Sequence, residues 1–174
     1  LLAVVYRRLG EEWGVIVTWE ECQAYGLSVR HWPAFKDSHR SLRYLKQYYK
    51  IVVLTNTDNK SFQGSNARLG VHFDGIYTAE DIGSYKPNDR NFEYMVTTLA
   101  RQGVKKSDIL HTAESLFHDH LPANKHLLPN CWIYRRHNKK GFGATLDPGK
   151  TPSFKFIFNS LADMVRAHKA ELSK

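Results

Sequence analysis

The sequence predicts an α/β protein built on a Rossmann-like parallel sheet with helices on both faces. Two observations carry this prediction. Short apolar runs alternate with amphipathic helical segments along most of the chain. Several of these runs also end abruptly in polar residues, as buried parallel strands do where they enter a loop. The clearest example is the apolar run Ile51–Leu54, which passes directly into Thr55, Asn56 and a polar segment that reaches Asn59.

The first part of the chain is expected to be helical. An apolar stripe at helical spacing between Leu2 and Trp13 predicts an amphipathic helix, with no capping residue in front of it. Thr18 is suited to cap a second helix, because two glutamates follow in its first turn. Pro33 ends that segment, and a third helix is expected to begin at Asp37 or the serine after it.

From Ile51 onward, strands and helices should alternate. The expected strands are Ile51–Thr55, Ile76–Thr78, Ile109–Thr112, Trp132–Tyr134 and Phe154–Phe158. A helix from Asn59 to Leu69, stopped by Gly70, should follow the first strand. The stretch Asn138–Ser153 contains three glycines and two prolines and predicts a long loop. This alternation is typical of a parallel sheet.

Composition excludes several classes of protein. The chain has 174 residues, of which 42% are hydrophobic, and no apolar run approaches the ~18 residues of a membrane-spanning helix. Cys22 and Cys131 are the only cysteines, too few for a disulfide framework or a zinc site, which agrees with a reducing compartment. The sequence therefore predicts a cytoplasmic protein with no membrane partner.

The net charge of +8 raises the question of nucleic-acid binding. Such binding requires basic residues gathered on one face, and here they are scattered. The one dense run is Arg135, Arg136, Lys139 and Lys140, and no motif of a nucleic-acid-binding domain is found. No nucleic-acid partner is expected.

Polar candidates for chemistry follow three of the expected strands. They are Thr55 and Asn56 after the first, Lys86 after the second, and Glu114 with Asp119 after the third. Ligands of open α/β sheets bind outside the carboxyl ends of the strands, so these side chains are expected to converge. Lys86 can hold a carboxylate ionised and stabilise an anionic leaving group. Two nearby carboxylates can bind a cation, hold that lysine or activate a water molecule.

Each candidate also has a purely structural interpretation. Thr55 and Asn56 could serve only to turn the chain, with Asp58 capping the next helix. Lys86 could be an ordinary surface lysine in front of a helix. The order and spacing of all the candidates together favour a functional site.

Three histidines surround the acidic pair. A zinc site is not expected, because His111 belongs to a strand, whereas His118 and His120 are two residues apart and diverge on a helix. One of the three is instead expected to orient Asp119, with the others packed or solvated.

The sequence segments WPAF, SNARLGVHFD, DIGSYKPN, ILHTAESLFHDH and WIYRRH occur in order between Trp32 and about Ser160. Together they resemble the haloacid dehalogenase superfamily. In that family a Thr or Ser ends one strand, a Lys precedes a helix, and an acidic pair follows a further strand. More narrowly, the segments resemble the type II 2-haloacid dehalogenases, and among these the azetidine-2-carboxylate hydrolases.

This resemblance implies a hydrolase without a cofactor. An upstream Asp nucleophile would attack the 2-carbon of a small 2-substituted carboxylic acid and break a carbon–halide or carbon–nitrogen bond. Lys86 would stabilise the reacting groups, Thr55 and Asn56 would hold the substrate carboxylate, and Glu114 or Asp119 would guide the water that cleaves the ester. The alternative is a phosphatase of the same superfamily, with Glu114 and Asp119 as ligands of Mg²⁺.

The resemblance also implies a nucleophile strand that is not found, because no strand ending in Asp precedes Leu1. Residues 1–36 are therefore expected to be the C-terminal part of a helical cap. Residues 37–174 are expected to be a hydrolase core without its central strand, which belongs between the strands that start at Ile51 and Ile109. The chain would then be a truncated part of a longer reading frame and inactive alone; the alternative is a natural chain without catalysis. A homodimer is left open.

Overall fold

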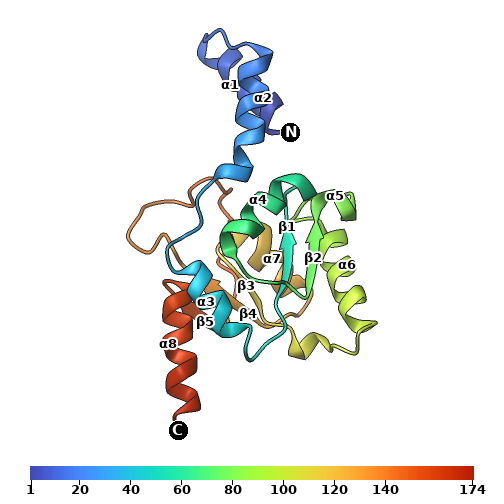
Figure 1. Cartoon of the computed structure of the whole chain (residues 1–174), viewed down its shortest axis with the longest axis vertical. Helices are drawn as coiled ribbons and strands as arrows, with labels where there is room; N and C mark the ends of the chain where they lie inside the picture. The colour runs from blue at the N-terminus through green and yellow to red at the C-terminus, as the bar shows by residue number, and fades with distance from the viewer.

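Five parallel strands lie in two separate sheets in the computed structural model of the chain, which describes residues 1–174. One sheet has two strands and the other has three (Figure 1). The strands are β1 Val52–Thr55, β2 Gly75–Thr78, β3 His111–Ala113, β4 Asn130–Ile133 and β5 Phe156–Phe158. Every pairing is parallel: β1 with β2, β3 with β4, and β4 with β5. The predicted α/β class with a parallel sheet is confirmed.

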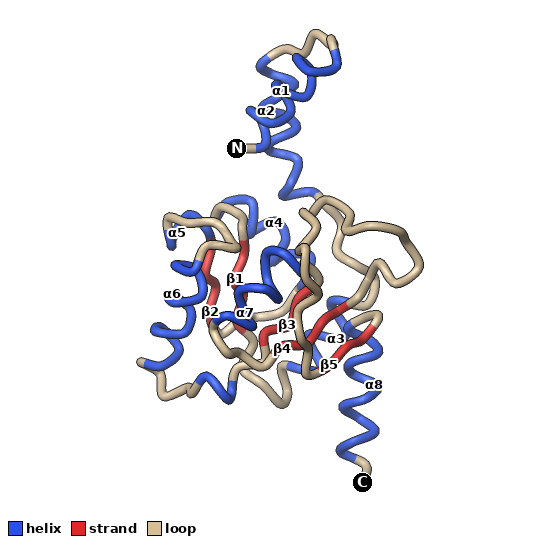
Figure 2. The backbone as a smooth tube through the Cα atoms, turned by 180° about the vertical axis from the view of Figure 1, so that it is seen from behind, coloured by secondary structure: helices blue, strands red, loops and turns tan.

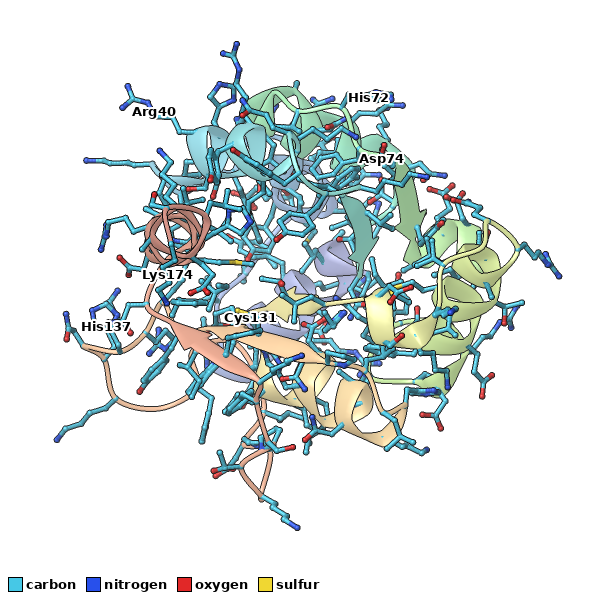
Figure 3. The ribbon with its side chains drawn as sticks, turned by 90° about the horizontal axis from the view of Figure 1, so that it is seen from below. Arg40, His72, Asp74, Cys131, His137 and Lys174 are labelled. Atoms are coloured by element: carbon cyan, nitrogen blue, oxygen red, sulfur yellow. The ribbon has the colours of Figure 1, made fainter.

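The two sheets face each other across unpaired edges of β1 and β3. Each of these strands has a partner on one side only, so both lie at an edge of their sheet. The expected break between them is observed. All four residues of β1 are only partly buried. Leu110, just before β3, and Thr112, within β3, are exposed. Figure 3 shows the two groups of strands, with Asp74 next to one and Cys131 in the other.

Eight α-helices surround the strands. They are α1 Leu2–Trp13, α2 Trp19–Leu27, α3 Ser38–Leu45, α4 Asn59–Leu69, α5 Ala79–Ile82, α6 Asp89–Ala100, α7 Leu121–Lys125 and α8 Leu161–Leu172. Short helical turns lie at Ser28–His31 (η1), Lys106–Asp108 (η2) and Leu116–His120 (η3, a π-helix). Figures 1 and 2, seen from opposite sides, show α3 and α4 in front of the strands in one view and α7 in front in the other.

Helix α4 has the predicted bounds, and its ends show why. The Asp58 side chain accepts a hydrogen bond from the Ser61 N–H and caps the first turn. Gly70 adopts a left-handed conformation at the other end, which favours glycine over residues with a Cβ. Both signals are local, so the sequence alone could place this helix.

The first two helices pack against each other and project from the rest of the chain (Figure 1). Thr18 and Glu21 form the expected capping box at the start of α2. The rings of Tyr6 and Tyr25 stack with their centroids 4.8 Å apart. This pair of helices therefore has its own small interface.

The turn η1 attaches this helical pair to the core through α4. Gly64 on α4 lies against the backbone of Arg30, and the space left there is too small for a Cβ atom. The Arg68 guanidinium donates a hydrogen bond to the Arg30 carbonyl. Glycine at position 64 is therefore required by the close approach of two backbones.

The apolar core lies beside the two-stranded sheet. Helix α6 presents Phe92, Met95 and Leu99 to it, and all three are buried. The core cluster consists of Tyr77, Ile82, Phe92, Met95, Leu99, Ala123 and Leu128. Residues from β2, α5, α6 and α7 thus share one core, although β3 to β5 form a different sheet.

Asp37 joins elements that are distant in the sequence. Its carboxylate accepts a hydrogen bond from Arg135 Nη1 at 2.9 Å and from the Ala162 N–H at 3.1 Å. The Arg135 guanidinium also lies over the Phe35 ring, 4.1 Å from its centroid. One residue of the basic run is therefore engaged within the protein.

None of the eight helices is long and apolar enough to cross a membrane. Cys22 and Cys131 are both buried as free thiols.

Candidate active site

Lys86 and Asp119 form a nearly buried ion pair. The distance from Lys86 Nζ to Asp119 Oδ1 is 2.7 Å, and the two side chains are 10% and 9% exposed. The same ammonium donates to the Leu54 carbonyl oxygen at 2.9 Å. Because Leu54 belongs to β1 and Asp119 to η3 after β3, Lys86 connects the two sheets at their carboxyl ends.

Asn56 fixes the backbone from which Lys86 extends. Its Oδ1 accepts from the Lys86 N–H at 2.7 Å, and its Nδ2 donates to the Lys86 carbonyl at 3.0 Å. Both ends of the amide are therefore bonded to one residue 30 positions away. Neighbouring Thr55 shares a hydrogen bond with the Thr57 hydroxyl at 3.1 Å. Of the two residues expected to hold a substrate carboxylate, Asn56 is thus occupied by the loop that carries the lysine.

His111 is the histidine that contacts Asp119. Its Nε2 lies 3.1 Å from Asp119 Oδ1, the same oxygen that Lys86 contacts. Burial would raise the pKa of Asp119, but the charge of Lys86 and the hydrogen bond from His111 outweigh it and hold the pKa well below its ordinary value. Asp119 is therefore ionised at neutral pH.

Glu114 does not join this cluster. Its carboxylate has no hydrogen-bond or ion-pair partner and lines a partly open cavity of about 50 Å³. Burial raises the pKa of Glu114, the charge of Arg136 opposes that shift, and the negative charge of Asp119 adds to it. The main-chain carbonyl of Glu114 accepts a hydrogen bond from Trp132 Nε1 at 2.9 Å.

The other two histidines are engaged elsewhere. His120 is fully buried, with its ring nitrogens 3.1 Å from Asn130 Oδ1 and 3.0 Å from the Ala113 carbonyl. His118 lies next to Ser115, with Nδ1 at 3.1 Å from the hydroxyl. Burial lowers the pKa of both imidazoles.

Two features of the site could not be assigned from the sequence. The sequence left open which histidine orients Asp119, and the position of His111 at the start of β3 settles it. The double hydrogen bond of Asn56 to Lys86 joins two loops, and no local pattern indicates it. For both features, the sequence indicated only that the carboxyl ends of the strands lie close together.

Comparison with known protein families identifies one family. The model of the haloacid dehalogenase-like hydrolases matches residues 2–124, and the chain therefore belongs to this family. A comparison with curated proteins finds no match.

Solved structures share the fold. The L-2-haloacid dehalogenase of Xanthobacter autotrophicus, with chloropropionic acid covalently bound, has a TM-score of 0.78 and 15% identity over 96% of this chain and 74% of its own. The HAD-hydrolase YfnB of Bacillus subtilis, bound to magnesium, has a TM-score of 0.76 and 16% identity over 95% and 70%. The L-2-haloacid dehalogenase PA0810 has a TM-score of 0.75 and 17% identity over 97% and 70%. At these identities the likeness concerns the fold.

Proposed function

We propose that the protein hydrolyses a carbon–halide or carbon–nitrogen bond at the 2-carbon of a small carboxylic acid. The observation that carries this proposal is the Lys86–Asp119 pair, a buried cation and an ionised carboxylate placed at the carboxyl ends of β1 and β3. The membership of the chain in the haloacid dehalogenase-like hydrolases supports a hydrolytic reaction. L-2-haloacid dehalogenases among the structural neighbours support this class of substrate.

The proposed reaction has two steps. An aspartate nucleophile, carried by a strand between β1 and β3, attacks the 2-carbon, and the leaving group departs with its bonding electrons. The Lys86 ammonium stabilises the nucleophile as a carboxylate and the negative charge that develops. Water then attacks the carbonyl carbon of the resulting ester, which releases a 2-hydroxy acid and restores the aspartate.

The chain's own residues divide the remaining roles. Asp119 is ionised and can accept a hydrogen bond from the attacking water. Thr55 is the residue left to receive the substrate carboxylate, because the Asn59 and Ser61 amides at the start of α4 already donate to Glu80 and Asp58. Asn56 positions Lys86 through the loop backbone. The unpaired edges of β1 and β3 support the place given to the nucleophile strand.

Magnesium would serve the rival phosphatase reaction, with Glu114 and Asp119 as ligands. The donor set fits it poorly. No group of three or more His, Cys, Asp or Glu side chains is close enough to hold a metal ion. Asp119 Oδ1 already contacts two nitrogen donors, and Glu114 faces a separate cavity. The proposed dehalogenase-type reaction needs no metal, since its charge stabilisation comes from Lys86.

The test uses the natural gene product, with any residues that precede Leu1. Its activity is measured on 2-chloropropionate, azetidine-2-carboxylate and an aryl phosphate, with and without EDTA. Turnover of either carboxylic acid that resists EDTA is expected, and Lys86→Met should abolish it while Lys139→Met, a change at an exposed residue, does not. Activity on the phosphate alone, lost in EDTA, would overturn the proposal.

A further inference from the structure

A second pocket lies apart from the Lys86–Asp119 pair. It is the cavity of about 50 Å³ at the carboxyl end of β4, bounded on one side by the long loop before β5. Glu114, Trp132, Tyr134, Arg136 and Phe142 are among its lining residues. A cavity needs roughly 10–15 Å³ to hold a single water molecule, so this cavity can hold a group of a few heavy atoms.

The Glu114 carboxylate is the one acidic group that lines this cavity. It is partly buried and receives no hydrogen bond from any residue, so its oxygens are free to accept hydrogen bonds from a group that enters the cavity. Arg136 lines the same cavity, and its charge acts on the Glu114 carboxylate without a direct ion pair between the two side chains. The Arg136 guanidinium instead donates to the Lys140 carbonyl at 2.9 Å and to the Gly141 carbonyl at 3.4 Å.

The remaining wall is aromatic and well supported. The Trp132 ring stacks on Tyr134 with centroids 4.1 Å apart, and on Phe154 with centroids 5.0 Å apart. The indole N–H is bonded to the Glu114 carbonyl, which ties the wall to the residue that carries the free carboxylate. A carboxylate beside aromatic rings is the usual protein environment for an organic ammonium group.

We propose that this cavity binds the ammonium group of a small primary amine or amino acid, with Glu114 as its counter-ion. An ammonium ion supplies the hydrogen-bond donors that Glu114 lacks, and its charge offsets that of a partly desolvated carboxylate. The small volume limits the bound group to an ammonium and the carbon next to it. This binding does not depend on the proposed hydrolase reaction, because neither Lys86 nor Asp119 lines the cavity.

Binding is measured by calorimetry on the whole chain, with methylammonium and L-alanine as probes and propionate as the probe without an ammonium group. Both ammonium probes should bind more tightly than propionate. Glu114→Gln, which keeps the shape and removes the charge, should weaken them about ten-fold or more, the usual contribution of a charge-assisted hydrogen bond. The matched control is Glu93→Gln on the exposed face of α6, which should change nothing.

A second measurement covers the case in which the Gln variant does not fold. In wild-type protein with ¹³C-labelled glutamate, methylammonium should shift the carboxyl resonance of Glu114 and leave that of Glu93 unmoved. Equal affinity for L-alanine and propionate, or an unmoved Glu114 resonance at saturating methylammonium, would overturn the proposal. Both readouts measure binding, so a failure of the proposed hydrolysis would not affect them.

Discussion

Removing Lys86 or Asp119 alone should cost most of the stability that is lost when both are removed, so the two losses should not add. Asp119→Asn leaves the Lys86 ammonium nearly buried with neutral acceptors and no counter-ion. Lys86→Met leaves the Asp119 carboxylate with only His111. Breaking one half of a buried ion pair typically costs about 3–5 kcal/mol, and the side chains here are 10% and 9% exposed, so we expect about 3 kcal/mol for each single variant.

The double variant Lys86→Met/Asp119→Asn leaves no buried charge without a partner. Its loss of stability should therefore be smaller than the sum of the two single losses, with a coupling energy of about 2 kcal/mol. Free energies of unfolding from urea titrations of the four proteins measure this cycle. Single losses that add to within about 0.5 kcal/mol would refute the reasoning, because additivity is the behaviour of groups that do not interact.

The Lys86–Asp119 pair should also affect how the stability of the protein depends on pH. The pKa of Asp119 is lowered in the folded protein, so the pair stabilises the fold at every pH above the ordinary carboxyl pKa of ~3.9. That stabilisation is lost as the pH falls from there toward the lower folded value. The difference in stability between wild type and Asp119→Asn should therefore be constant between about pH 7 and 5 and shrink in stronger acid.

Three further substitutions have defined outcomes. Asn56→Ala removes both hydrogen bonds to the Lys86 backbone and should reduce the free energy of unfolding by about 1–3 kcal/mol in urea titrations; no loss would show that solvent replaces them. Gly64→Ala puts a Cβ against the Arg30 backbone, so hydrogen exchange in η1 should accelerate, and unchanged exchange would contradict that close contact. Thr18→Ala removes the cap of α2 and should lower stability by about 0.5–2 kcal/mol, whereas Thr18→Ser should keep most of it.

Local signals were enough to predict much of the fold. Helix α4 follows from Asp58 at its start and Gly70 at its end, both of which act within one turn. The start of the last strand was less predictable. It was expected at Phe154, but β5 begins at Phe156, because the Phe154 ring packs on Trp132 outside the ladder. A contact with a residue 22 positions earlier in the chain leaves no trace in the local pattern.

The sequence predicted which strand ends carry the candidate site, but not how its side chains are oriented. Their convergence placed Lys86 near Asp119, and the structure brings the two into contact. The same reasoning grouped Glu114 with Asp119, although the Glu114 side chain faces another cavity. Glu114 lies in the loop directly after β3, whereas Asp119 lies in η3, so the order of the two residues along the chain does not fix where their side chains point.

The missing ladder between β1 and β3 has a consequence for how the molecule moves. In a continuous sheet, a row of backbone hydrogen bonds holds neighbouring strands at a fixed spacing. Here the Lys86 ammonium bonds both the Leu54 carbonyl of β1 and Asp119. A side chain with four rotatable bonds therefore helps to hold the two sheets together. Such a connection permits small changes in the angle between the two sheets. The unpaired amides along β1 and β3 should accordingly exchange with solvent faster than those on their paired sides, a mechanical softness located where the proposed nucleophile strand would insert.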